Sequence, residues 1–152
     1  MYDAKTDSYR STPKDYGKAI SSAELVNGIR RYFPCSDEDP SVHTTHELTP
    51  APPLGLPASR LLPVLNAVLS KVTELKTVIY DYEWRIYGGS LLLVYEGGQD
   101  ADHPGKLSVK LIDFAHTRHL PGHGRDEGLL KGIDTVIRLL EGRISEIQAL
   151  SR

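Results

Sequence analysis

The sequence has little of the chemistry that marks secreted or membrane-spanning proteins. It contains 1 cysteine in 152 residues, so no internal disulfide can form, and it has no N-x-S/T glycosylation acceptor. No apolar run approaches the roughly 20 residues that a membrane-spanning helix needs. The first ten residues are polar and lack the apolar stretch of a secretory signal. We therefore expect an intracellular protein, in the cytoplasm, the nucleus or both, with no membrane span.

The sequence also lacks an excess of charge of either sign. Its formal net charge is −2, so there is no overall basic character to indicate a nucleic-acid partner. Apolar residues make up 39% and charged residues 25% of the chain, which is typical of a folded globular protein. The length suits one domain over residues 1–152. No feature of the sequence identifies a protein partner.

The spacing of apolar residues predicts an α+β fold. A stripe spaced by four and three residues predicts a long helix from 59 to 79, and a similar stripe predicts a final helix over 127–150. Between them, alternating and continuous apolar runs predict an antiparallel meander of three strands within residues 82–113. The Gly88–Gly89 pair permits a tight reversal after its first strand. The middle strand, "SLLLVYEG", is expected to be buried on both faces.

The first third of the chain is less regular. Ser21 and Glu24 have the spacing of a capping box, which predicts a short helix ending near residue 32. Residues 1–12 indicate one or two short strands or a turn. The segment 34–58 is rich in proline and acids and has no periodicity, so we predict a surface loop that is the least ordered internal segment.

An acidic residue stands where one predicted strand should end. In "KLSVKLIDFAHT", residues 106–117, the alternation stops at Ile112 and Asp113 follows. An aspartate here can form a turn by accepting backbone N–H groups. It can also hold a divalent cation, because Mg²⁺ favours one or two carboxylates together with phosphate oxygens and water. Asp-Phe supplies the metal ligand in one familiar kinase motif. The dipeptide alone leaves both interpretations open.

Three segments in order carry a family resemblance. They are "SLLLVYEG" from Ser90, "KLIDFAHT" containing Asp113, and "DEGLLKGIDTVIRLL" from Asp126. Together they resemble the inositol polyphosphate kinase family, and "IDFAHT" is most similar to its multikinase branch. The resemblance covers nearly the whole chain except the loop at 35–56. It implies the C-terminal lobe of an inositol polyphosphate kinase-like fold and ATP-dependent phosphorylation of inositol phosphates with Mg²⁺.

The resemblance also implies roles for particular residues. Asp113 would be the magnesium ligand beneath the β- and γ-phosphates of ATP, and Ser90 would lie on the nucleotide side. His116 would contact the inositol phosphate substrate, since an imidazole can donate to a ring hydroxyl or a phosphate. Each role has a structural alternative. Ser90 can be a hydroxyl that bonds to the backbone at a strand start, and His116 can be a loop histidine in solvent.

One family motif does not occur in this sequence. The pattern P-x-x-x-D-x-K-x-G is missing, and in the family it supplies the catalytic aspartate and a substrate-binding lysine. The segment resembling the N-terminal lobe, with its ATP-phosphate lysine, is missing as well. We therefore assign no catalytic residue and expect a truncated form with little activity alone. The alternative is a non-catalytic binding or scaffolding fragment of the same family.

Five histidines suggest a rival metal site. His116, His119 and His123 lie close in the sequence, and His43 and His46 share a spacing that zinc can use. Structural zinc sites commonly recruit cysteines, and this chain has 1 cysteine. A structural zinc site is therefore not the favoured interpretation.

Overall fold

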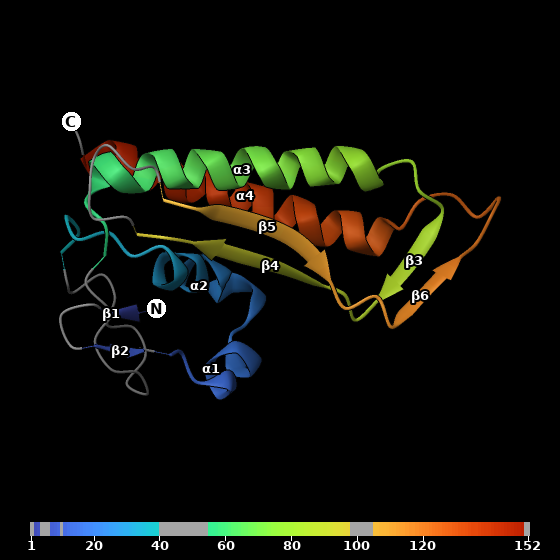
Figure 1. The fold of residues 1–152 in the computed structure, drawn as a ribbon, viewed down its shortest axis with the longest axis horizontal. Coiled ribbons are helices and arrows are strands. Elements are labelled where there is room, and N and C mark those ends of the chain that lie inside the picture. Colours follow the sequence, from blue (N-terminus) through green and yellow to red (C-terminus); the bar gives the residue numbers. More distant parts are fainter. Residues whose placement is uncertain (1, 4–6, 10, 40–54, 98–104, 151–152) are drawn as a thin grey trace. The chain divides into compact units, whose positions relative to one another are not determined.

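The predicted α+β class is confirmed by the computed structural model, in which long helices lie beside antiparallel strands (Figure 1). The structure describes residues 2–3, 7–9, 11–39, 55–97 and 105–150. Over these ranges no helix is long and apolar enough to cross a bilayer. The chain divides into two compact units, which we call the N-terminal unit (1–62 and 145–152) and the ribbon unit (63–144).

The N-terminal unit is built from short elements. They are β1 (Tyr2–Asp3), β2 (Ser8–Tyr9), α1 (Lys14–Ala19), η1 (Ser22–Glu24) and α2 (Leu25–Tyr32). The predicted capping box is present, since the Ser21 backbone N–H donates to the Glu24 carboxylate at 3.0 Å. Strands β1 and β2 pair in antiparallel fashion, as the short-strand prediction for residues 1–12 allowed.

A bidentate ion pair joins two helices of this unit. The guanidinium of Arg30 on α2 donates to both carboxylate oxygens of Glu146, at 3.1 and 2.6 Å. Glu146 belongs to the last turns of α4 (Glu127–Leu150). Both side chains are partly buried, so this pair is screened less by solvent than an exposed one.

Both ends of the predicted loop 34–58 make ordered contacts. Cys35 and Leu56 form an isolated parallel bridge, and Asp37 accepts the backbone N–H of Ala58 at 2.8 Å where α3 (Ala58–Ile79) begins. These contacts satisfy one of the N–H groups that a helix start leaves without an intrahelical partner. The middle of the predicted loop, residues 40–54, lies outside the described residues, so its predicted low order stays a prediction.

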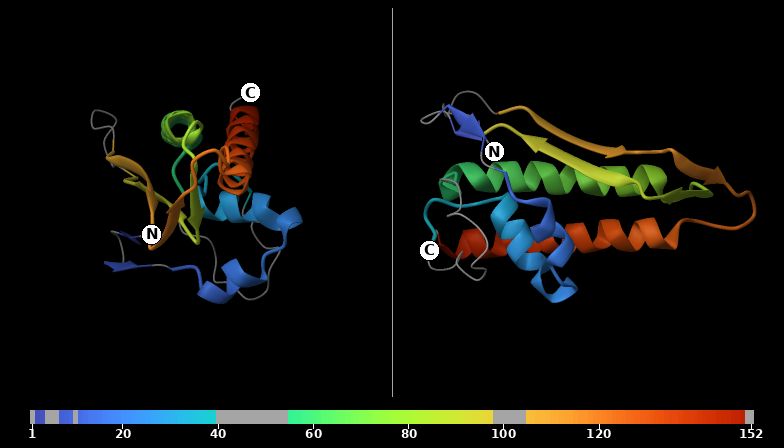
Figure 2. Two further views of the ribbon diagram at one scale, coloured as in Figure 1. Left: turned by 90° about the vertical axis from the view of Figure 1, so that its right-hand side faces the viewer. Right: turned by 90° about the horizontal axis from the view of Figure 1, so that it is seen from below.

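The two long helices supply the core of the ribbon unit. Their predicted apolar stripes are confirmed, because the buried side chains recur at helical spacing: Leu65, Val68 and Val72 on α3, and Leu130, Ile133, Leu140 and Ile144 on α4. The helices run alongside each other (Figures 1 and 2), and Lys76 of α3 bonds Asp134 of α4 at 2.6 Å. Full burial of one such aliphatic side chain stabilises a fold by roughly 1.5–3 kcal/mol.

The strands form one long two-stranded ribbon with a break in it. The four strands are β3 (Trp84–Tyr87), β4 (Ser90–Tyr95), β5 (Leu107–Ile112) and β6 (His116–His119). Strand β4 pairs with β5, and β3 pairs with β6, both in antiparallel fashion (Figure 1). The ribbon thus runs out through β3 and β4 and returns through β5 and β6.

This pairing corrects two expectations about the strands. Gly88 and Gly89 do not form a reversal between paired strands, because the chain continues from β3 into β4 at this point. Strand β4 is not buried on both faces, since its residues alternate between exposed and half-buried and Val94 is 50% exposed. Successive residues of a strand point to opposite faces, so the alternating pattern of β4 shows that only one face of the strand is covered.

Candidate functional site

The break in the ribbon gathers the three residues singled out in the sequence. Ser90 opens β4 opposite Ile112, the residue before Asp113. His116 opens β6 opposite Tyr87. The break therefore lies between these two residue pairs, with Asp113 inside it. Sequence reasoning placed Asp113 at a strand end, and the structure agrees.

Asp113 has an unusual backbone conformation. Its φ is +67°, in the left-handed region, and Gly88, in the connection between β3 and β4, has φ +71°. A non-glycine residue pays roughly 1 kcal/mol or more for this conformation, although aspartate tolerates it better than most. Such outliers concentrate at functional sites. This conformation motivates a functional hypothesis for the residue rather than a purely structural one.

The side chains of Asp113 and Ser90 are exposed and bond to nothing in the part of the chain that the structure describes. The turn interpretation of Asp113 requires its carboxylate to accept backbone N–H groups. The structural interpretation of Ser90 likewise requires a bond from its hydroxyl. Neither bond is present among the described residues, so both groups are available to a ligand.

An open hollow of about 500 Å³ lies beside the break. Its lining residues are Tyr87, Ala115, His116, Thr117 and Arg118. The hydroxyl of Thr117 is buried and has no hydrogen-bond partner among the described residues. Thr117 pairs with Ile86, so its side chain projects to the opposite face of the ribbon from those of His116 and Arg118. Asp113 does not line the hollow, so the two predicted site residues lie at the same break but not in one common hollow.

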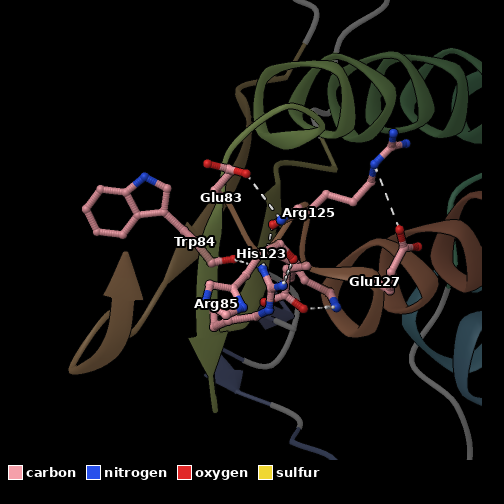
Figure 3. Close-up of polar contacts among 9 residues, drawn as sticks. Glu83, Trp84, Arg85, His123, Arg125 and Glu127 are labelled. Carbon is pink, nitrogen blue, oxygen red and sulfur yellow. Dashed lines mark hydrogen bonds and ion pairs between the residues drawn. The ribbon is translucent and has the colours of Figure 1, made fainter. Parts of the chain in front are cut away.

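The loop after β6 is fastened to β3 by an arginine that sequence reasoning missed. Arg85 of β3 donates to the backbone carbonyls of Gly124 at 2.9 Å and His123 at 2.7 Å (Figure 3). A guanidinium presents its donors in a rigid fork, so two adjacent carbonyls are held at once. The positions of Gly122 and Gly124, both at positive φ, were the available sequence signal for a tight loop here.

A glutamate holds the same loop from its amide side. The carboxylate of Glu83 accepts the backbone N–H groups of Gly122 at 3.0 Å and Gly124 at 3.2 Å (Figure 3). These two bonds lower the pKa of Glu83, and the charges of His119 and His123 lower it further. The loop is therefore anchored most firmly when Glu83 is ionised.

Asp126 joins the end of this loop to both β3 and α4. One carboxylate oxygen accepts the backbone N–H of Ile86 at 2.9 Å, and the other accepts that of Leu129 at 3.0 Å. The second bond caps the start of α4, and the negative charge suits a helix N-terminus. The strand that carries Tyr87 into the hollow is thus fixed to the helix core.

Loss of the Glu83 charge should release the loop at low pH. The pKa of Glu83 is depressed in the folded state, so its stabilising effect is present above the ordinary glutamate pKa of about 4.3 and is lost as pH falls through the lower folded value. The NMR amide shifts of Gly122 and Gly124 should titrate with a midpoint below about 4.3. Glu83→Gln should abolish that titration, while Glu74→Gln on the exposed side of α3 should leave it intact. A midpoint above the ordinary value would contradict the anchoring role.

No metal cluster of three histidine, cysteine or acidic side chains occurs within the described residues. His116 and His119 are three apart on β6, so their side chains point to opposite faces of the ribbon. His119 instead packs on Trp84, with ring centroids 5.1 Å apart. His43 and His46 lie outside the described residues. The described histidines therefore give no support to the zinc interpretation.

Comparison with known structures defines the class of fold. The inositol phosphate multikinase of Saccharomyces cerevisiae, solved in complex with ADP and Mn²⁺, matches with a TM-score of 0.66 at 22% identity. The match covers 93% of this chain and 54% of that one. The α+β arrangement described above is thus the fold of part of an inositol phosphate kinase.

Sequence comparison identifies the family. A model of the inositol polyphosphate kinase family matches residues 1–141. Mouse inositol hexakisphosphate kinase 3 is 30% identical over 51% of this chain and 24% of its own length. The inositol polyphosphate multikinase of Saccharomyces cerevisiae is 44% identical over 28% of this chain and 12% of its own length. The chain belongs to the inositol polyphosphate kinase family, as the three sequence motifs predicted, and it spans a quarter or less of these two relatives.

Proposed function

We propose that this chain forms the nucleotide- and substrate-binding lobe of a kinase that transfers the γ-phosphoryl group of ATP to a hydroxyl of an inositol polyphosphate. The observation that carries the proposal is Asp113, whose carboxylate stands at the ribbon break in left-handed backbone with no partner among the described residues. Membership of the family and the relative solved with ADP and Mn²⁺ support the same assignment.

Asp113 is proposed to hold a divalent cation, Mg²⁺, against the nucleotide phosphates. A single carboxylate fits this role because magnesium completes its shell with phosphate oxygens and water. When bound, the ion neutralises charge on the phosphoryl group in transfer. The left-handed backbone at Asp113 and the strand pair on one side of it fix the point of the main chain from which the carboxylate extends.

Ser90 and His116 complete the proposed site. The Ser90 hydroxyl starts the strand across from Asp113, is exposed and is free to donate to the nucleotide. His116 lines the hollow on the other side of the break, where its imidazole can donate to a hydroxyl or phosphate of the inositol substrate. The break then separates a nucleotide side from a substrate side.

This chain supplies binding groups, and we assign it no catalytic acid or base. The pattern P-x-x-x-D-x-K-x-G, which brings the family's catalytic aspartate, does not occur in the sequence. We therefore propose a form with little activity by itself. The alternative, a non-catalytic binding or scaffolding fragment, predicts that Asp113 has no role in nucleotide binding. An intracellular location, in the cytoplasm or nucleus, stays a prediction.

Metal-dependent nucleotide binding tests this proposal. Isothermal titration calorimetry of the purified chain should show that Mn²⁺ or Mg²⁺ tightens ADP binding, because the cation bridges the phosphates to Asp113. In Asp113→Asn the gain from the cation should disappear, a loss of about tenfold or more in affinity. The matched control is Asp134→Asn. Asp134 lies on α4, far along the sequence from the ribbon break, and pairs with Lys76. Equal cation dependence in the wild type and in Asp113→Asn would exclude the proposed metal role.

A further inference from the structure

Strand register places two arginines on the same face of the ribbon. In the β3–β6 pair, Arg85 lies directly opposite Arg118, and Tyr87 lies opposite His116. Directly paired residues of an antiparallel pair project to the same side, and so do residues two apart on one strand. These four side chains therefore share one face, which we call the arginine face. Trp84 and its partner His119 project from the other.

The arginine face has a charge arrangement that the fold does not explain. Like charges placed directly opposite each other destabilise a strand pair. Arg85 is occupied by the carbonyls of His123 and Gly124. Arg118 is exposed and has no bonding partner in the described part of the chain. The carboxylate of Glu83, two residues before Arg85, already accepts two backbone N–H groups.

Arg118 also borders the hollow of about 500 Å³, together with Tyr87 and His116. This volume lies within the range of small-molecule sites. Three side chains able to donate hydrogen bonds therefore reach it from one face, and no carboxylate lines it. The lining fits an anion that carries many oxygen atoms.

We propose that Arg118 binds a phosphate group of the inositol polyphosphate and so favours more highly phosphorylated inositols. This phosphate is a different group of the substrate from the one that His116 contacts. This inference rests on the proposed function. A guanidinium binds phosphate through two parallel hydrogen bonds, which a lysine at this position does not reproduce. The phosphate also relieves the repulsion between Arg118 and Arg85.

The hollow is assigned to the inositol phosphate rather than to the nucleotide. The groups proposed for the nucleotide side are Ser90 and Asp113, and neither lines the hollow. Two bases, His116 and Arg118, line the hollow, and none of its lining residues is an acid with a carboxylate. A ligand that brings several phosphates and no metal requirement matches this lining, whereas ADP with its cation needs a carboxylate nearby.

Calorimetric binding to the 152-residue chain tests the inference, with inositol trisphosphate, tetrakisphosphate and hexakisphosphate as ligands and inorganic phosphate for comparison. Arg118→Ala should raise the Kd for tetrakis- and hexakisphosphate about tenfold or more, because a charge-assisted bond is lost. The Kd of Arg118→Lys should lie between those of the wild type and Arg118→Ala. Arg138→Ala removes another exposed arginine, on α4, and should change each Kd less than about twofold. Circular dichroism checks that each variant keeps the fold.

Each outcome separates this inference from the proposed function. Equal Kd values for Arg118→Ala and the wild type, or equal losses in Arg118→Ala and Arg138→Ala, would overturn the role of Arg118 and leave the nucleotide site untouched. A loss confined to ADP with Mn²⁺ would overturn the assignment to substrate. Inorganic phosphate should displace bound inositol tetrakisphosphate less effectively than an equal concentration of inositol hexakisphosphate does. Equal displacement by the two would exclude selectivity for the polyphosphate. Arg118-dependent binding of inositol polyphosphates without cation-dependent ADP binding would support the inference and count against the proposed kinase site.

Discussion

The purified 152-residue chain is expected to transfer phosphate from ATP to inositol trisphosphate or tetrakisphosphate at a negligible rate. Loss of a general acid or base alone typically costs roughly 100- to 10,000-fold. The motif that supplies the family's acceptor for the substrate proton does not occur in this sequence. The site that we propose uses Asp113 for a cation and His116 for the substrate, and both would be positioning groups. We therefore expect turnover at least about 100-fold below that of a full-length family member.

A radiolabelled ATP assay measures this directly. The wild-type chain, Asp113→Asn and a full-length family member should be assayed at equal concentration with Mg²⁺. Turnover by the wild-type chain and by Asp113→Asn is expected to be indistinguishable from background. Robust turnover that vanishes in Asp113→Asn would show that these 152 residues build a working site, and the expectation of little activity would be wrong.

Truncation of Leu140 should cause a large loss in the free energy of unfolding. This side chain of α4 is 0% exposed in the core of the ribbon unit. Leu140→Ala removes buried methyl groups and leaves a cavity, which typically costs about 2–5 kcal/mol in the free energy of unfolding. Urea unfolding followed by circular dichroism should show a lower midpoint. Leu150→Ala, at a site 47% exposed near the end of the same helix, should cost less than about 1 kcal/mol. Equal losses in the two variants would contradict the core assignment.

The two long helices and the family motifs were determined by the sequence alone. The stripes at Leu65, Val68 and Val72 and along α4 identified both long helices, because helical contacts are local and their period is written in neighbouring residues. The capping box of Ser21 and Glu24 was visible for the same reason, since its partners are three residues apart. Motif order was enough to indicate the family, and the end of the apolar alternation placed Asp113 at a strand end.

Strand pairing was decided by the tertiary structure. Alternation shows that a segment is extended but not which segment it pairs with, so β3 was assigned to β4 instead of β6. Strand β6, "HTRH", has no apolar alternation that could have identified it, because it lies in an exposed ribbon. The glycine pair permitted a reversal, but Tyr87 pairs with the distant His116, so the chain continues through the glycines without reversing.

The candidate site divides in the same way. Asp113 and His116 were found from the sequence because they lie in one contiguous motif, and Ser90 because it opens a second one. The left-handed backbone of Asp113, its unbonded carboxylate and the fastening of the loop by Glu83 and Arg85 required coordinates. The pairing of Arg118 with Arg85 joins residues 33 positions apart (118 − 85). No local pattern carries that information, because it is set by strand register across the whole ribbon.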